Sequence, residues 1–176
     1  MASVFGHGIV GYTISKVASK SNLKKLVILA VVSSMLPDID VLAFHFGVPY
    51  EAPLGHRGFT HSILFAFIWA IALTFAFGKT RRKLYFAVLF LSTISHGILD
   101  AMTTGGRGVG FFIPFDNTRY FLPFRVIKVS PLSVSQFFSE WGWQVILSEL
   151  KYIFLPCAVV LIFSYKYDFY HPQNKK

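Results

Sequence analysis

Gly55-His56-Arg57-Gly58-Phe59-Thr60-His61-Ser62 is the stretch that decides how this chain must be built. It places two imidazoles, a guanidinium and two hydroxyls within eight residues, and an almost uninterrupted apolar run, 63–77, follows at once. Polar and ionisable groups beside a membrane-length apolar helix are costly unless they find partners. The stretch therefore predicts a polar site at one end of a membrane helix.

The composition supports lipid as the main solvent of the chain. Of its 176 residues, 54% are hydrophobic and only 14% are charged, whereas a soluble domain is about one quarter charged. This length predicts a single membrane-embedded domain over 1–176, with the lipid bilayer as its main partner. The net charge of +9 comes from Lys and Arg that lie between apolar runs, which is typical of topology signals, so we expect no nucleic-acid partner. A single cysteine, Cys157, excludes an internal disulfide and a Cys-based zinc site.

Five segments have the length or composition of membrane crossings. They are 2–19, 26–45, 62–78, 84–102 and 150–167. The first is only weakly apolar, and it suits a position packed inside a bundle. We expect an all-α fold, a multi-pass transmembrane helical bundle of about four or five membrane helices. Residues 103–150, which mix aromatic and basic side chains, predict an interfacial loop region.

Local signals refine two of these segments. Pro37 lacks a backbone N–H, so we expect it to kink or end the helix of 26–45. Thr60 is a favourable N-cap and predicts a helix that begins at His61. The glycines of the first segment, Gly6, Gly8 and Gly11, predict a close approach by another helix.

The basic residues predict the orientation. Residues 79–83 hold four cations, which marks that loop as cytoplasmic. Five crossings then place the N-terminus outside and the C-terminus inside, and seven polar residues fall toward the outer side. They are His7, Asp38, Asp40, His56, His61, His96 and Asp100. The cations of the predicted outer loop, Arg107, Arg119, Arg125 and Lys128, run against the charge rule.

These seven residues predict a metal site. Two aspartates in a membrane segment cost about 2.5–3.5 kcal/mol each, and a bound cation would offset that cost. His96 and Asp100 are four residues apart and share a helix face. Imidazole and carboxylate ligands without cysteine suit zinc best, with manganese or iron as alternatives. Seven residues exceed one tetrahedral site, so either two metals bind or some of the residues only orient the ligands. His45 and His171 lie outside polar clusters and are not expected to bind.

A metal in an open site lowers the pKa of its water toward 7 and so supplies a hydrolytic nucleophile. Asp38, Asp40 and Arg57 are the predicted catalytic residues, and Arg119, Arg125 and Lys128 are predicted to bind an anionic substrate. Two rival interpretations use the same residues: a closed structural metal site, and a transporter whose ligands pass the metal across the membrane.

The ordered set of motifs resembles a known family. His7, the run 36–40, the stretch 56–62 and the pair His96 and Asp100 are similar to the YdjM/YbcI-type inner-membrane proteins, usually described as LexA-regulated or membrane-bound metal-dependent hydrolases. The resemblance implies an inner-membrane, metal-dependent hydrolase, and we expect a phosphoester or lipid-borne ester as its substrate. The orientation predicted from the basic residues puts its site toward the periplasm. The alternative is a metal-binding membrane protein or transporter without hydrolase activity.

That family is in turn distantly similar to zinc-dependent phospholipase C and P1-type nucleases. His96 and Asp100 match their His-x-x-x-Asp pair, and His7 matches their early histidine. Their second pair, His-x-x-x-Glu, has no counterpart here, because Glu149 lacks a histidine partner.

Overall fold

The computed structural model describes residues 1–19, 23–131 and 134–170. Within these ranges the chain is helical and has no strand, which confirms the predicted all-α class. The α-helices are α1 (Val4–Ala18), α2 (Lys24–Met35), α3 (Ile63–Phe77), α4 (Arg82–Ala101), α5 (Val134–Phe137), α6 (Glu140–Glu149) and α7 (Leu155–Tyr170). Two 3₁₀ helices, η1 (Leu36–Phe46) and η2 (Phe59–His61), and a π-helical segment, η3 (Leu150–Phe154), complete the order.

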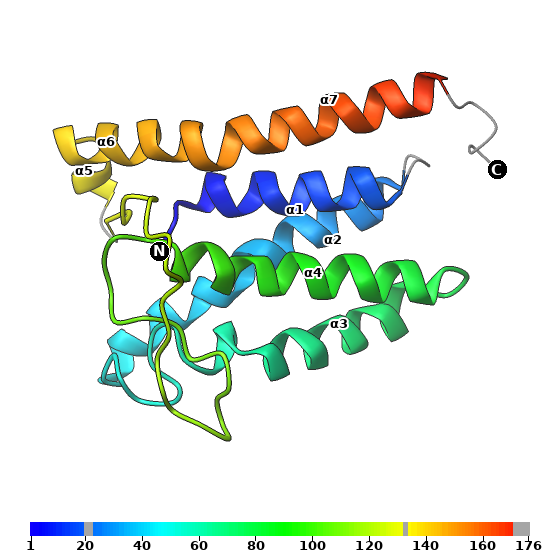
Figure 1. The fold of residues 1–176 in the computed structure, drawn as a ribbon. Helices are drawn as coiled ribbons and strands as arrows, with labels where there is room; N and C mark the ends of the chain where they lie inside the picture. Colours follow the sequence, from blue (N-terminus) through cyan, green and yellow to red (C-terminus); the bar gives the residue numbers. More distant parts are fainter. Residues whose placement is uncertain (20–22, 132–133, 171–176) are drawn as a thin grey trace.

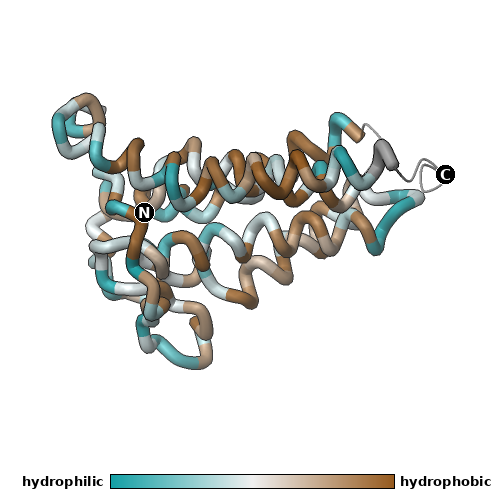
Figure 2. The backbone as a smooth tube through the Cα atoms, turned by 45° about the horizontal axis from the view of Figure 1, so that its top comes forward, coloured by the Kyte–Doolittle hydropathy of each residue, from teal (hydrophilic) through white to brown (hydrophobic). Residues whose placement is uncertain are grey.

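Three helical stretches of the described chain are long and apolar enough to cross a membrane: Lys24–Phe46, Arg82–Ala101 and Glu140–Tyr167. A fourth apolar helix, Ile63–Phe77, is shorter. Together they confirm a helical membrane bundle. Helices α1, α3, α4 and α7 run roughly along one direction, and α2 runs obliquely to them (Figure 1). Hydrophobic residues follow their length, and hydrophilic residues gather toward their ends (Figure 2).

Helix α1 packs within the bundle, against α2, α4 and α7. The predicted close approach occurs at Gly11, where an added Cβ would lie 2.6 Å from the carbonyl oxygen of Ala30 in α2. A small residue at this point lets the two backbones meet. The neighbouring core joins α2, α3 and α4 through Leu26, Ala30, Ala70, Tyr85, Val88 and Leu89.

The structure confirms the effect of Pro37 and corrects the start of the last membrane stretch. Helix α2 ends at Met35, and Pro37 lies in the first turn of η1. The last membrane stretch begins at Glu140, ten residues before the predicted start at 150, because α6 continues through η3 into α7. The interfacial region is therefore shorter than predicted.

The predicted N-cap at Thr60 is wrong. Thr60 lies in η2, and α3 begins at Ile63 with Ser62 as its cap, whose hydroxyl accepts from the Phe65 N–H at 3.0 Å. The Thr60 hydroxyl instead donates to Asp40 Oδ2 at 2.7 Å. An N-cap oxygen accepts a backbone N–H, whereas the Thr60 hydroxyl donates to a charged carboxylate, a stronger hydrogen bond that holds this side chain at Asp40 and leaves the cap to Ser62.

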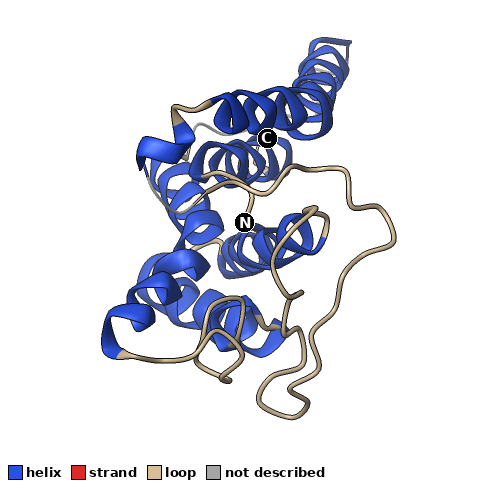
Figure 3. Cartoon of the chain, turned by 90° about the vertical axis from the view of Figure 1, so that its left-hand side faces the viewer, coloured by secondary structure: helices blue, strands red, loops and turns tan. Residues whose placement is uncertain are grey.

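The two ends of the bundle differ. The connection between α3 and α4, with the cations of 79–83, lies at one end, and the long connections 47–62 and 102–131 lie at the other beside the N-terminus (Figure 1). Seen from that second end, these connections form a layer of loop across the helix ends (Figure 3). The predicted site residues belong to this looped end.

Candidate metal centre

Five separate elements bring the seven predicted ligands together. Helix α1 supplies His7, η1 supplies Asp38 and Asp40, the following loop supplies His56, η2 supplies His61, and α4 supplies His96 and Asp100. Two overlapping groups result, each with its candidate ligand atoms within 4.8 Å of one another. The first is Asp38, His61, His96 and Asp100; the second is Asp40, His56 and His61.

In the first group, two imidazole nitrogens face each other. His96 Nδ1 lies 2.8 Å from the Ser34 carbonyl oxygen, which can only accept, so the proton belongs on Nδ1. His61 Nδ1 lies 3.1 Å from the Thr60 hydroxyl oxygen, and Thr60 gives its own proton to Asp40 Oδ2. The Thr60 oxygen can therefore only accept from His61, and Asp40 Oδ2 also lies 3.1 Å from the same nitrogen, so the His61 proton belongs on Nδ1 as well. The two Nε2 atoms then face each other at 3.1 Å as lone pairs, a spacing that only a shared proton or a cation can stabilise.

Carboxylate oxygens surround this pair of nitrogens. Asp38 Oδ1 lies 3.3 Å from His96 Nε2 and 3.7 Å from His61 Nε2, and Asp100 Oδ2 lies 3.6 Å from His61 Nε2. Neither oxygen of Asp38 has a hydrogen-bond partner, although both are buried. Two ligand atoms bound at about 2.0–2.1 Å to one tetrahedral zinc ion stand about 3.3–3.4 Å apart, which is close to these spacings.

The field at His61 favours a cation. Burial would lower the pKa of His61, but the carboxylates of Asp100, Asp38 and Asp40 together raise that pKa well above its ordinary value. A site that attracts a proton this strongly also attracts a divalent metal ion, because both respond to the same negative charge.

Asp40 is fully engaged by donors. Its Oδ1 accepts from His56 Nδ1 at 2.7 Å, and its Oδ2 is approached by the backbone N–H of Arg57 at 3.0 Å, the Thr60 hydroxyl and His61 Nδ1. A carboxylate offers about four lone-pair sites, so these contacts fill it. Its position matches that of a carboxylate that orients a ligating histidine.

Arg57 connects the centre to the loop that follows α4. The side chain is buried, its Nε lies 2.9 Å from Asp100 Oδ2, and its Nη2 donates to Thr103 Oγ1 at 3.0 Å. Gly106 has φ +84°, and a Cβ there would lie 2.5 Å from Arg57 Nη1. The glycine therefore leaves room for the guanidinium. Sequence reasoning missed this role of Thr103 and Gly106, whose only signal was the glycine-rich run itself.

The three predicted substrate-binding cations lie in the looped end. Arg119 donates to the carbonyl oxygens of Ala52 at 3.0 Å and His56 at 3.1 Å. Arg125 donates to the carbonyls of Thr103 and Thr104, at 3.0 and 2.8 Å, and lies over the Phe121 ring. Lys128 lies 5.5 Å from the Trp141 ring. The guanidiniums of Arg119 and Arg125 thus stabilise the loops around the centre. The role of all three cations in substrate binding stays a prediction.

His7 and the N-terminal segment enclose the remaining side of the metal centre. The His7 ring stacks on His96 with 3.6 Å between centroids, and its Nε2 lies 3.5 Å from Asp100 Oδ1. The Ala2 N–H donates to the same Asp100 oxygen at 2.8 Å, a contact that no sequence signal indicated. Glu149, which has no histidine partner, accepts from the backbone and hydroxyl of Ser3.

Fold and centre together define a multi-pass helical membrane protein with a buried His/Asp cluster at one end of its bundle. The chain belongs to the YdjM family: the family described as YdjM inner membrane protein matches residues 1–171. It is 42% identical over 165 residues to inner membrane protein YbcI of Escherichia coli (strain K12), which covers 92% of this chain and 95% of that protein. No solved structure matches it.

The family and the apolar helices support an inner-membrane location. The periplasmic orientation of the centre stays a prediction. So does the more distant similarity to zinc-dependent phospholipase C and P1-type nucleases.

Proposed function

We propose that the chain is an inner-membrane, metal-dependent hydrolase. Its divalent metal, best matched by zinc, would be held by Asp38, His61, His96 and Asp100. The observation that carries the proposal is the pair of facing Nε2 atoms, 3.1 Å apart, each with its Nδ1 hydrogen-bonded to an oxygen acceptor. Such a pair, beside carboxylate oxygens without donors, is the arrangement of ligands around a cation.

The donor set fits a divalent metal. Two nitrogens and two carboxylate oxygens, without cysteine, suit zinc, and manganese or iron remain alternatives. His7 would be a further ligand of the same metal ion, because both of its ring nitrogens are buried without a hydrogen-bond partner. Asp40 and His56 then orient the ligands, which accounts for seven polar residues around one centre.

Bound in this set, the metal would supply a hydrolytic nucleophile at neutral pH. The chain's own residues support the rest of the site. Arg57 neutralises Asp100 and fixes its Oδ2, and Asp38, whose side chain is 10% exposed, is the predicted ligand nearest to solvent. The cations of the looped end favour an anionic substrate, which we propose to be a phosphoester or other lipid-borne ester.

A metal-binding protein without hydrolase activity is the second candidate. The burial of the ligands favours it, since His61, His96 and Asp100 are at most 2% exposed and closed sites are usually structural. A carrier has less support. Toward the other end of the bundle, the buried side chains of α3 and α4 that carry polar atoms are the hydroxyl residues Thr74, Tyr85, Ser92 and Thr93, which are weak partners for a divalent cation.

Metal analysis combined with turnover in proteoliposomes tests the proposal. His61→Ala and Asp100→Asn should each lower bound zinc markedly, and both should abolish zinc-dependent cleavage of an anionic phosphoester panel. His45→Ala is the matched control, because that side chain is exposed in η1; His171 lies outside the described residues.

Three outcomes would count against the hydrolase. Full zinc binding without turnover would favour a structural site, and zinc uptake into the vesicle lumen without turnover would favour a carrier. Equal zinc loss in His45→Ala and His61→Ala would mean that the cluster is not the binding site.

A further inference from the structure

An apolar cavity of about 380 Å³ lies between the start of α3, the middle of α4 and the loop 111–115. Five of its eight lining side chains are phenylalanines, and the other three are isoleucine or leucine. The lining offers no side-chain hydrogen bond, so its occupant must be a hydrocarbon.

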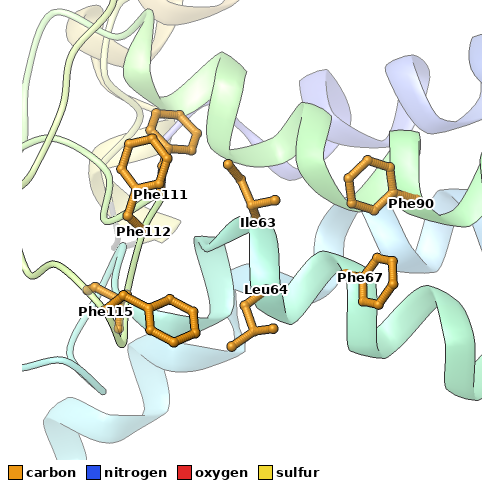
Figure 4. A pocket seen from close by; sticks show the side chains of 8 residues that line it. Ile63, Leu64, Phe67, Phe90, Phe111, Phe112 and Phe115 are labelled. Carbon is orange, nitrogen blue, oxygen red and sulfur yellow. The ribbon is translucent and has the colours of Figure 1, made fainter.

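The cavity extends along the helices. Phe111, Phe112 and Phe115 lie at its looped end, and Phe67 and Phe90 lie at its other end (Figure 4). Ile63 and Leu64 lie between these two groups (Figure 4). Helix α4 is one of the candidate membrane spans. A chain lying in the cavity would therefore run in the same direction as the membrane-spanning helices, as lipid tails do.

The cavity opens on the apolar surface of the bundle. Ile63 and Phe67 of α3 are 40% and 45% exposed, although they line it. Ala66 and Ala70 of the same helix are buried in the bundle. Phe75, 68% exposed, continues the open face of α3 beyond the cavity. The opening is thus continuous with a surface that lipid contacts in a membrane protein.

The cavity also shares its wall with the metal centre. Ile63 follows the proposed ligand His61 by two residues, and its N–H donates to the Phe111 carbonyl at 3.0 Å. Gly110, the residue before Phe111, donates to the carbonyl of Arg57 at 2.9 Å. A Cβ on Gly97 of α4 would lie 3.0 Å from the His61 carbonyl and 3.2 Å from the Phe111 ring. Backbone contacts therefore fix the cavity relative to the centre.

We propose that this cavity binds one acyl chain of a membrane phospholipid and so holds its phosphate headgroup at the looped end, beside the metal centre. The acyl-binding half stands on the cavity alone. The assignment of that lipid as the substrate rests on the proposed function. The substrate class is then a phospholipid within the bilayer and not a free phosphoester.

Photocrosslinking tests the acyl site. The full-length protein would be reconstituted in nanodiscs with phosphatidylglycerol that carries a diazirine in one acyl chain, and labelled peptides would be mapped by mass spectrometry. We expect labelling of 63–67 and 111–115 to exceed that of α7 several-fold. Helix α7 is the internal reference, since its Leu155, Ile162 and Phe163 are more than half exposed and report bulk lipid.

Two variants close or open the cavity. The larger side chain of Leu64→Trp would occupy the cavity. In this variant, photolabelling of 63–67 and 111–115 should fall about tenfold, the change expected for loss of roughly two buried methylenes of the acyl chain. Phe112→Ala removes a half-exposed wall and should give a smaller loss. Phe75→Trp and Phe124→Ala are the matched controls, because both side chains are exposed outside the cavity.

Bound zinc separates this proposal from the proposed function. Leu64→Trp should keep its zinc and lose the label, whereas His61→Ala should lose zinc and keep the label. If the wild type lacks zinc yet labels the cavity, the metal proposal fails and the acyl site stands. Cavity labelling no stronger than that of α7, or unchanged in a zinc-loaded Leu64→Trp variant, would overturn the acyl site.

Discussion

At the scale of single residues, the centre depends on how protons are distributed over two histidines. Each ring gives its Nδ1–H to an oxygen acceptor, and this leaves both Nε2 atoms facing each other. The acceptor is the Ser34 carbonyl for His96 and the Thr60 hydroxyl, held by Asp40, for His61. The orientation of both ligating rings therefore depends on the positions of these acceptors. The acceptor of His61 is the one that a substitution can test, through Asp40, because the other acceptor belongs to the backbone.

Asp40→Asn should lower zinc affinity about 10–100-fold while leaving some binding, the usual cost of losing a carboxylate that orients a ligating histidine. The amide of the variant keeps one acceptor oxygen but loses the negative charge. Its NH₂ group cannot accept from the donors that contact the replaced carboxylate oxygen. Titration with a fluorescent zinc competitor would measure the change.

Asp116→Asn is the control, because that carboxylate is bound by Thr118 in the outer loop. Unchanged affinity in Asp40→Asn would contradict the orienting role. A loss as complete as that of His61→Ala would make Asp40 a ligand itself.

At the scale of elements, the packing of α1 on α2 depends on Gly11. An added methyl would meet the Ala30 carbonyl at 2.6 Å and Ser34 Oγ at the same distance, and backbone cannot move aside as a flexible side chain can. Ser34 also supplies the carbonyl that orients His96. The contact between these helices is thus coupled to the metal centre.

Gly11→Ala should reduce the free energy of unfolding by about 1–3 kcal/mol, the usual cost of overpacking, and should weaken zinc binding as well. Gly8→Ala on the same helix is the control. Its added Cβ would meet Met35 Sδ at 3.6 Å and Val31 Cγ1 at 3.8 Å, which are ordinary contacts, so helix propensity should leave this variant neutral or slightly stabilised. Unfolding in a denaturing detergent series would compare the two, and equal stabilities would refute the close approach.

The sequence allowed the convergence of the seven ligands to be predicted, since apolar length and basic loops place His7, Asp40 and Asp100 at one end of a bundle. It did not allow their division into ligands and orienting residues. That division depends on contacts across distant segments, such as Asp40 with His56 and Thr60, and on the loop that brings Thr103 to Arg57. The helix start at Ile63 was missed for the same reason: the acceptor that takes Thr60 away is twenty residues upstream.

At the scale of the whole molecule, the bundle separates a basic end from the looped end that holds the centre. The charge rule predicts that residues 79–83 lie in the cytoplasm, and the looped end would then face the periplasm. The cations of the looped end include Arg57, Arg119 and Arg125, whose guanidiniums are engaged by a carboxylate or by carbonyls. If the looped end faces the periplasm as predicted, their role in packing it would account for basic residues that run against the charge rule.

Single cysteines test this orientation in a Cys157→Ser background. Leu54→Cys, at a site 67% exposed in the looped end, should react with a membrane-impermeant thiol reagent on intact cells, and Thr80→Cys should react only after lysis. The reverse pattern would put the centre in the cytoplasm while leaving its geometry unaffected.

Asp38 and Asp40 belong to η1, the last turns of the candidate span Lys24–Phe46, whereas His96 and Asp100 belong to a different span, Arg82–Ala101. The ligand set is therefore divided between two helices whose relative tilt responds to the thickness of the bilayer. Zinc affinity should then vary with acyl-chain length when the protein is reconstituted in phosphatidylcholines of increasing length, with an optimum at one thickness. Equal affinity in thin and thick bilayers would mean that the loops alone hold the centre rigid. If zinc affinity has an optimum at one bilayer thickness, the hydrophobic width of the membrane would itself adjust the metal occupancy of the protein.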